Sequence, residues 1–274
     1  MKIQLVTNEK IAETSSKGNQ EKWLDKDTNK WYKVDQFGYE ALSEALISAL
    51  LCKSKQKNNT SFHFVRYYPE KVIVHGRERV SCVSDSFLKE GQSIITLSHL
   101  LTKNLGVPLR DRLLALPSDK QRIAYLAEKT AEYTGLERFG EYLTILFEID
   151  SLFLNDDRHL NNIAVIEQNG KYLYCPIFDN GAGLLSNVQM SPMDIEPKAL
   201  ISTLKARPFL TSFTRQMNTA RALFGSQLSM PKFSKAEIME ELSPLLEFYP
   251  SRDRGIITDR VCSCILMRQK FNQI

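Results

Sequence analysis

The sequence has no long hydrophobic run, which limits where the protein can work. Hydrophobic residues make up 43% of the 274 positions, but polar residues interrupt them throughout. No segment approaches the run of about 20 apolar residues that a membrane-crossing helix needs. Residues 1–10 also lack the apolar centre of a secretory signal peptide. We therefore expect no association with a membrane.

Cysteine is scarce, and charge of one sign is not concentrated anywhere. The five cysteines are odd in number and mostly have apolar neighbours, so they indicate neither a disulfide framework nor a paired metal site. The net charge is only +4 and the basic residues are scattered, so we expect no direct nucleic-acid binding. These properties favour a reducing cytoplasm, and an effector secreted into a host cell would have the same composition.

The first third of the chain is rich in strand patterns and carries one helix pattern. Short segments with alternating character predict strands at residues 1–7, 30–34, 61–68, 71–75 and 77–83. A helix is expected at 39–51, where apolar side chains recur at helical spacing. The dipeptide His75-Gly76 predicts a turn that makes the last two strands a hairpin.

From about residue 88 the pattern becomes helical. Ser118 and the three residues after it have the form of a capping box, and the helix that they begin should end at Gly135. Three further helices are expected, at 137–154, from Ser234 onward and at 258–271. The segment at 137–154 is strongly apolar, which is typical of a core helix.

The order of these patterns predicts a small β-rich lobe followed by a larger helical lobe. We place the first lobe at residues 1–87 and the second at 88–274, with the boundary within 84–92. The fold class is therefore α+β. The chain has 274 residues, which is near the size at which one hydrophobic core divides into two.

A polar loop follows the long apolar helix and contains the most distinctive residues of the chain. It reads Asn-Asp-Asp-Arg-His-Leu-Asn-Asn at residues 155–162, and a predicted hairpin with an Asn-Gly turn follows it. Antiparallel pairing about that turn would bring Asn162 within about two residues of Asp179. Amide and carboxylate oxygens are hard ligands suited to Mg²⁺. We therefore predict that Asn162 and Asp179 bind magnesium.

These residue types at this spacing are the ones that phosphoryl transfer from ATP needs. Asp157 precedes Asn162 in the loop, so its carboxylate can orient a hydroxyl nucleophile without binding the metal. His159 belongs to the same catalytic loop, where we assign it a scaffolding role rather than proton transfer. The pattern predicts a kinase that uses ATP and Mg²⁺.

A kinase also needs a cation on the nucleotide phosphates. Lys33 lies on a predicted strand, and either Glu40 or Glu44 on the following helix could hold its ammonium group in place. Ser84 and Asp85 follow the predicted N-terminal hairpin. We expect these two residues to form the hinge between the lobes and to bind adenine.

The loop from Asp157 to Asn162 resembles the Asp-Arg-His-x-x-Asn loop of phosphatidylinositol kinases. It is closer to the Asp-x-His-x-x-Asn loop of HipA-like serine/threonine kinases, and Phe178-Asp179 is similar to the aromatic-Asp magnesium motif of that family. The resemblance implies a two-lobed, protein-kinase-like fold with Asp157 as catalytic base and Asn162 and Asp179 as magnesium ligands. It also favours Glu40 over Glu44 as the partner of Lys33.

The segment from Ser15 to Lys22 is similar to the Ser-x-x-Gly-x-Gln-x-Lys phosphate loop of the same family. This implies that the nucleotide is bound by Ser15, Ser16, Gly18 and Gln20, and that Ser15 can be autophosphorylated. HipA-like kinases are toxins of bacterial persistence modules, which implies an antitoxin or other regulatory partner. The long N-terminal subdomain of full-length HipA proteins is expected to be absent.

The chain departs from the HipA-like pattern at one position of the loop. Asn161 stands where these loops often have a lysine, which leaves open how the charge on the transferred phosphoryl group is neutralised. Arg158 and Lys33 are the two substitutes that we consider. Residues 205–209, which contain two basic side chains, and Arg215 form a modest basic cluster, and we interpret it as a solvated face.

We predict an ATP- and Mg-dependent serine/threonine protein kinase of HipA-like type, whose substrate is a protein with a Ser or Thr hydroxyl. One alternative is a lipid or small-molecule kinase, since inositol-lipid kinases share the Asp-Arg-His loop. Residues 180–196 contain no Lys or Arg that would bind an anionic head group there, which argues against it. The other alternative is a pseudokinase that binds a partner without transferring phosphate.

Overall fold

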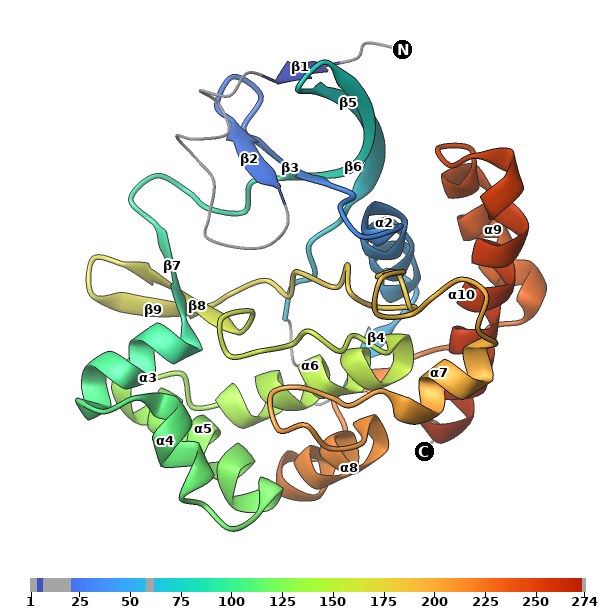
Figure 1. Ribbon diagram of the computed structural model, residues 1–274. Helices are drawn as coiled ribbons and strands as arrows, with labels where there is room; N and C mark the ends of the chain where they lie inside the picture. The colour runs from blue at the N-terminus through green and yellow to red at the C-terminus, as the bar shows by residue number, and fades with distance from the viewer. Residues whose placement is uncertain (1–3, 7–20, 58–61, 273–274) are drawn as a thin grey trace.

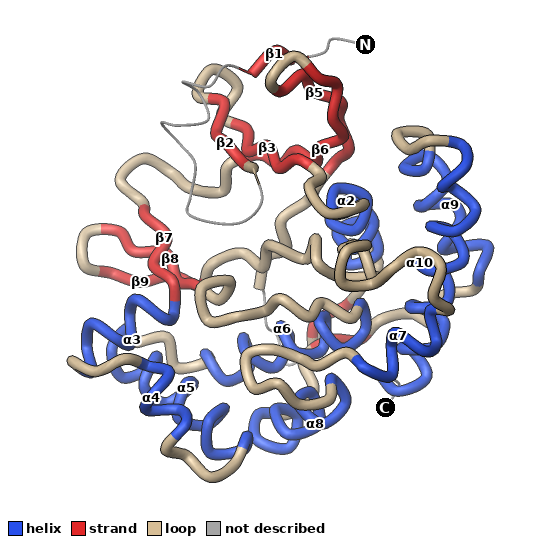
Figure 2. The backbone as a smooth tube through the Cα atoms, viewed as in Figure 1, coloured by secondary structure: helices blue, strands red, loops and turns tan. Residues whose placement is uncertain are grey.

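The structure of the protein is a computed structural model, and it describes residues 4–6, 21–57 and 62–272. A sheet-rich N-terminal lobe lies next to a larger, mostly helical C-terminal lobe (Figure 1). Figure 2 shows that most strands gather in the N-terminal lobe and most helices in the C-terminal one. The predicted α+β layout of two lobes is confirmed, while the limits 1–87 and 88–274 stay a prediction.

The N-terminal lobe is built on a five-stranded sheet in the order β1-β5-β6-β3-β2. Its strands are β1 (Gln4–Val6), β2 (Lys22–Asp25), β3 (Lys30–Val34), β5 (Tyr68–Val74) and β6 (Arg77–Asp85). β1 runs parallel to β5, and the other pairs are antiparallel. β5 and β6 form the predicted hairpin. Its turn has positive φ at His75 and Gly76, as two-residue hairpin turns favour.

The two faces of this sheet differ in chemistry. On one face, Trp23 stacks on Tyr32 with ring centroids 5.3 Å apart, and valines from β3, β5 and β6 complete an apolar cluster. Side chains alternate along a strand, so Lys33 and its register partner Cys82 point to the opposite face. There Cys82 packs with Ala41 of α2 (Glu40–Leu51). β3 therefore presents its lysine toward α2 rather than toward the apolar cluster.

The strand predicted at residues 61–68 is wrong. Of the described residues in this range, only Tyr68 lies in a strand, at the start of β5. The segment instead pairs with the C-terminal lobe: Val65 donates its N–H to the carbonyl of Ile177 (2.9 Å), and Ile177 donates to the carbonyl of His63 (2.7 Å). Its alternating pattern therefore reflects contact with a distant segment, not membership of the sheet.

α2 is buried along its whole length and packs between the two lobes (Figure 1). It contacts the sheet on one side and α9 (Lys235–Leu246) on the other. A helix that is buried on every side is characteristic of a protein interior. At its start, the carboxylate of Glu40 accepts the backbone N–H groups of Phe37 (2.8 Å) and Gly38 (3.1 Å). These bonds satisfy donors close to the first turn of the helix.

A three-stranded sheet follows the N-terminal lobe, in the order β7-β8-β9. Its strands are β7 (Ser93–Thr96), β8 (Ala164–Gln168) and β9 (Lys171–Tyr174). β8 and β9 form the predicted hairpin, with φ of 53° at Asn169 and 77° at Gly170, as a type I′ turn requires. The return strand ends at Tyr174 rather than Phe178, and the sequence did not predict β7. A separate pair joins β4 (Lys55–Gln56) and β10 (Leu228–Ser229).

α6 (Phe139–Phe153) is the central helix of the C-terminal lobe, and its residues are almost all buried. Around it lie α3 (Leu97–Leu105), α4 (Leu109–Leu114), α5 (Asp119–Thr134), α7 (Pro197–Thr203), α8 (Phe213–Phe224) and α10 (Ser251–Asn272). α5 begins and ends as predicted, with Ser118 as N-cap and Gly135 as C-cap, and Ser234 forms the predicted capping box of α9. None of the described helices combines the length and apolar character needed to cross a membrane.

A buried carboxyl group connects the two lobes. Asp35 follows β3, and its Oδ1 accepts the N–H of Ala41 (2.6 Å) while its Oδ2 accepts the hydroxyl of Tyr249 from the C-terminal lobe (2.7 Å). Burial raises the pKa of Asp35 to about 8, although both hydrogen bonds oppose the shift. At neutral pH the folded protein therefore holds a proton here that the unfolded chain releases.

We predict that Asp35 makes the protein less stable as pH rises. Its folded-state pKa lies above the unfolded value, so its contribution is complete at low pH and is lost as pH rises through about 8. Asp35→Asn cannot titrate, so between about pH 5 and about pH 8 its free energy of unfolding should change less than that of the wild type. We expect a difference on the order of 3 kcal/mol, measured by urea unfolding. Equal losses in the two proteins would contradict this.

Candidate functional site

The end of α6 leads the chain directly into the loop at 155–162. The side chain of Asn155 fixes the start of this loop. Its Nδ2 donates to Oδ1 of Asp150 on α6 (3.1 Å) and to the backbone carbonyl of Asp179 (3.2 Å), and its Oδ1 accepts the N–H of Asp157 (3.3 Å). Asn155 therefore holds the loop against the segment that carries Asp179.

Arg158 is the buried centre of the loop. Its fully buried guanidinium pairs with the carboxylate of Asp150 at 3.0 Å. Its Nη1 donates to the backbone carbonyls of Asn162 (3.3 Å) and Phe178 (2.7 Å), and its Nη2 donates to Oδ1 of Asn180 (2.6 Å). One planar group thus joins α6, the loop and the segment that follows β9. Hydrogen bonds from a charged donor of this kind are among the strongest in proteins.

The prediction that Arg158 could neutralise the transferred phosphoryl group is wrong. A guanidinium has five N–H donors. Here Nε and one donor of Nη2 bind Asp150, and the remaining three bind Asn162, Phe178 and Asn180. Arg158 is therefore committed to holding the site together and presents no donor to a substrate.

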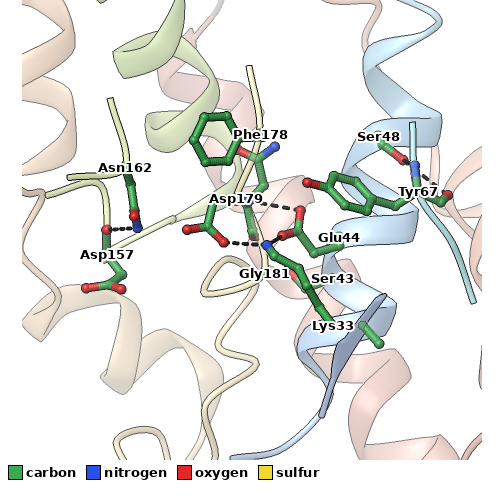
Figure 3. Close-up of polar contacts among 12 residues, drawn as sticks. Lys33, Ser43, Glu44, Ser48, Tyr67, Asp157, Asn162, Phe178, Asp179 and Gly181 are labelled. Carbon is green, nitrogen blue, oxygen red and sulfur yellow. Dashed lines mark hydrogen bonds and ion pairs between the residues drawn. The ribbon is translucent and has the colours of Figure 1, made fainter. Parts of the chain in front are cut away.

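Asp157 and Asn162 lie at the two ends of a tightly folded turn. His159 donates its N–H to the carbonyl of Asp157 (2.7 Å), and Asn162 donates its N–H to the carbonyl of His159 (2.8 Å). The side-chain Nδ2 of Asn162 also donates to the carbonyl of Asp157, at 3.0 Å (Figure 3). Because the amide nitrogen is used within the loop, the amide oxygen of Asn162 is the atom that can face a ligand.

Lys33 connects the N-terminal lobe to Asp179. Its Nζ lies 2.5 Å from Oε1 of Glu44 and 2.5 Å from Oδ1 of Asp179 (Figure 3). The other carboxylate oxygen of Glu44 accepts the N–H of Asn180 at 2.9 Å. The predicted pairing of Lys33 with Glu40 is therefore wrong. Glu44 lies one helical turn further along α2, whereas the carboxylate of Glu40 is bound to the backbone before the helix.

Positive charge from two lysines balances the carboxylate of Asp179. Lys22 lies opposite Lys33 in the β2–β3 register. Burial by itself would raise the pKa of Asp179, but Lys33 and Lys22 outweigh it and hold this pKa well below its usual range. Burial lowers the pKa of Lys22, and Asp179 acts in the opposite direction. The sequence did not predict Lys22 as a site residue, although it ends the motif that begins at Ser15.

The carboxylate of Asp157 is half exposed and has two basic neighbours. Nη1 of Arg207 lies 3.6 Å from its Oδ1, and Nε2 of His159 lies 3.7 Å from its Oδ2. Burial raises the pKa of Asp157, and the neighbouring side chains of His159 and Arg207 oppose this shift. Burial also raises the pKa of Asp156 to about 6, and the negative charge of Asp157 adds to the rise. The sequence analysis interpreted the basic cluster that contains Arg207 as a solvated face, whereas the structure places this side chain beside Asp157.

The remaining predicted site residues lie at the end of β6 or outside the described residues. Ser84 and Asp85 are the last residues of β6, where they pair with Trp31 and Lys30. Ser84 is buried and Asp85 is exposed, and their role as an adenine-binding hinge stays a prediction. The four phosphate-loop residues, Ser15, Ser16, Gly18 and Gln20, all lie outside the described residues.

The residues brought together here fit a magnesium ion. Within the ranges that the structure describes, no group of three or more His, Cys, Asp or Glu side chains could bind a metal. Mg²⁺ does not need such a group, because it usually takes one or two carboxylates and completes its shell with phosphate oxygens and water. Asp179 offers an ionised carboxylate that is 21% exposed, and Asn162 offers an amide oxygen. Both are the hard oxygen donors that this ion prefers.

Comparison with known proteins gives a match in structure but not in sequence. No family model and no curated protein sequence matches the chain. The fold is similar to that of the Helicobacter pylori proinflammatory kinase CtkA, with a TM-score of 0.60 and 11% identity over 94% of this chain and 92% of that one. A HipA chain from a Shewanella oneidensis HipA–HipB–operator DNA complex aligns with a TM-score of 0.47 and 13% identity, over 93% of this chain and 64% of that one. The likeness to CtkA confirms the predicted kinase-like fold.

We predict that Glu44→Gln destabilises the protein far more than Glu40→Gln. Glu44 is fully buried beside Lys33, so removing its charge leaves a buried ammonium with one anionic partner and should cost about 3 kcal/mol. The amide oxygen of the Glu40→Gln variant can still accept the N–H bonds before α2, so its free energy of unfolding should fall by only about 1 kcal/mol. Urea unfolding of both variants measures the difference. Equal losses would mean that Glu44 is not the main partner of Lys33.

Proposed function

We propose that this protein transfers the terminal phosphoryl group of ATP to a Ser or Thr hydroxyl of another protein, with Mg²⁺ as cofactor. One observation carries the proposal. Asp179 contacts Lys33 of the N-terminal lobe, while Arg158 ties the same segment to the loop that bears Asp157 and Asn162. Phosphoryl transfer needs this combination of a cation, two oxygen ligands and a carboxylate near one point. The kinase-like fold supports the proposal.

Lys33 is suited to bind the nucleotide phosphates. Its ammonium is held between Glu44 and Asp179, so it is positioned before a substrate arrives. Such prior positioning of charge lowers the cost of reorganisation during the reaction. Lys22 lies next to it on β2 and adds positive charge to the same region.

Asp157 is suited to act on the acceptor. Its carboxylate is half exposed, so a hydroxyl on a large substrate can reach it, and it orients that hydroxyl and accepts its proton. Burial raises the pKa of Asp157, which makes it a stronger proton acceptor than a fully exposed aspartate. Asn162 and Asp179 would hold Mg²⁺, which when bound supplies positive charge against the phosphate oxygens.

A protein acceptor is favoured over an anionic lipid. Residues 180–196 follow Asp179 directly and contain no Lys or Arg to bind a phosphorylated head group. The resemblance of the loop to HipA-like kinases also favours a serine/threonine protein kinase. Autophosphorylation at Ser15, an antitoxin-type regulatory partner and a cytoplasmic location remain predictions from that resemblance.

Labelled phosphate tests the proposal directly. Incubation with γ-labelled ATP, Mg²⁺ and a general protein acceptor should label the acceptor or the protein itself, and intact mass should locate any added phosphate. Asp157→Asn should reduce the transfer rate by at least about 10³-fold, because it removes the proton acceptor but keeps the side-chain shape. Asp179→Asn should abolish the magnesium dependence together with most of the activity.

A matched control separates this effect from a general effect of losing a carboxylate. Asp111→Asn makes the same change at an exposed position of α4 and should leave the rate unchanged. Full activity in Asp157→Asn would remove Asp157 from the mechanism. Binding of ATP and Mg²⁺ without transfer in the wild type would instead identify a pseudokinase.

A further inference from the structure

The two cations that the sequence offered for the transferred phosphoryl group are already engaged. Arg158 is fully buried and uses all five of its donors within the site. Lys33 is bound to both Glu44 and Asp179, and the proposal above assigns it to the nucleotide phosphates. Asn161 is exposed and carries no charge. The loop itself therefore supplies no free Lys or Arg beside Asp157, and its other basic group there is His159, whose Nε2 lies 3.7 Å from Oδ2 of Asp157.

Arg207 is a cation beside Asp157 whose donors are available. Its Nη1 lies 3.6 Å from Oδ1 of Asp157, which is beyond normal hydrogen-bond length. Its guanidinium donates no hydrogen bond to any residue that the structure describes, and its side chain is 49% exposed. In the proposed reaction Asp157 contacts the acceptor hydroxyl. A group this close to its carboxylate therefore also lies close to the phosphoryl group that the hydroxyl attacks.

The backbone that carries Arg207 is firmly held. Ala206 is buried and donates its N–H to the carbonyl of Thr211 (2.7 Å), and the carbonyl of Arg207 accepts Nε2 of the buried Gln216 on α8 (2.8 Å). Two residues on, Phe209 packs edge-on against Phe147 of α6 with ring centroids 6.2 Å apart. The backbone of Arg207 is therefore fixed, while its guanidinium remains available to a ligand. This combination suits a residue that binds a reacting group.

We propose that the guanidinium of Arg207 binds the phosphoryl group while it is transferred, which rests on the kinase function proposed above. The acceptor oxygen forms a bond to the terminal phosphorus as the bond from that phosphorus to the bridging oxygen of ADP breaks. The electron pair of the broken bond leaves with ADP, and the hydroxyl proton passes to Asp157. Arg207 gains and loses no proton. It donates two parallel N–H bonds to the outer phosphoryl oxygens, for which its planar shape is suited.

The test compares Arg207→Ala, Arg207→Gln and Arg207→Lys with the wild type, and uses Lys205→Ala as a matched control. Lys205 is an exposed cation two residues earlier in the same segment. Removing the guanidinium should lower kcat by about 10²- to 10³-fold. The Kd of a non-hydrolysable ATP analogue should change less than about threefold, because the contact forms mainly in the transition state. Lys205→Ala should keep the wild-type rate.

Two further readouts separate direct contact from a structural role. Guanidinium ions added to Arg207→Ala should restore part of kcat, and Arg207→Lys should retain more activity than Arg207→Gln, since it keeps the charge. If Arg207→Ala does not fold, as judged by thermal unfolding, Arg207→Gln takes its place in the same comparison.

Three outcomes would contradict the proposed role of Arg207. A wild-type or higher kcat in Arg207→Ala and Arg207→Gln would show that the residue does not assist transfer. A loss confined to ATP affinity would show that it only binds the ground state, and failure of guanidinium rescue in a folded variant would show that it acts by packing. In all three cases Asp157→Asn would still be inactive and the kinase function would stand. If the wild type transfers no phosphate, the kinase function and this inference fall together.

Discussion

The buried ion pair between Arg158 and Asp150 is the interaction on which the rest of the site depends. Two charges removed from water are costly unless every donor and acceptor is satisfied. Here all five guanidinium donors have partners, which come from α6, the loop and the segment after β9. The positions of Asp157 and Asn162 are therefore set by the hydrophobic core through α6. Arg158 therefore holds the candidate site together and does not bind a substrate.

The second constraint runs between the lobes. Lys33 comes from β3, Glu44 from α2 and Asp179 from the C-terminal lobe, and their charges are compensated only when the three meet. Gly181 allows α2 to approach this segment closely, because a side-chain Cβ there would lie only 3.2 Å from Cγ of Glu44. The hydrogen bond between Asp35 and Tyr249 is a second contact between the same two lobes. The geometry of the proposed site is thus a consequence of how the lobes are docked.

Local patterns were a good guide where the structure is local. The β8–β9 hairpin was predicted because Asn169-Gly170 favours one turn type, and a hairpin of known register places its two ends together. Helix caps such as Ser118 were predictable for the same reason, since the bonded groups lie within four residues. The strand predicted at 61–68 was wrong because alternating apolar and polar residues show only that one face of a segment is buried. They do not show which part of the protein covers that face. Its partner is Ile177, more than 100 residues away along the chain.

The sequence alone determined the residue types that the chemistry needs and the short-range spacing among Asp157, Asn162 and Asp179. Only the tertiary structure decided which charges pair. Glu44 rather than Glu40 meets Lys33, Arg158 turns inward, and Arg207 reaches Asp157 from a distant loop. The physical reason is that an electrostatic partner is selected by distance and burial. These quantities are fixed when the lobes and helices pack, and spacing along the chain carries little information about them.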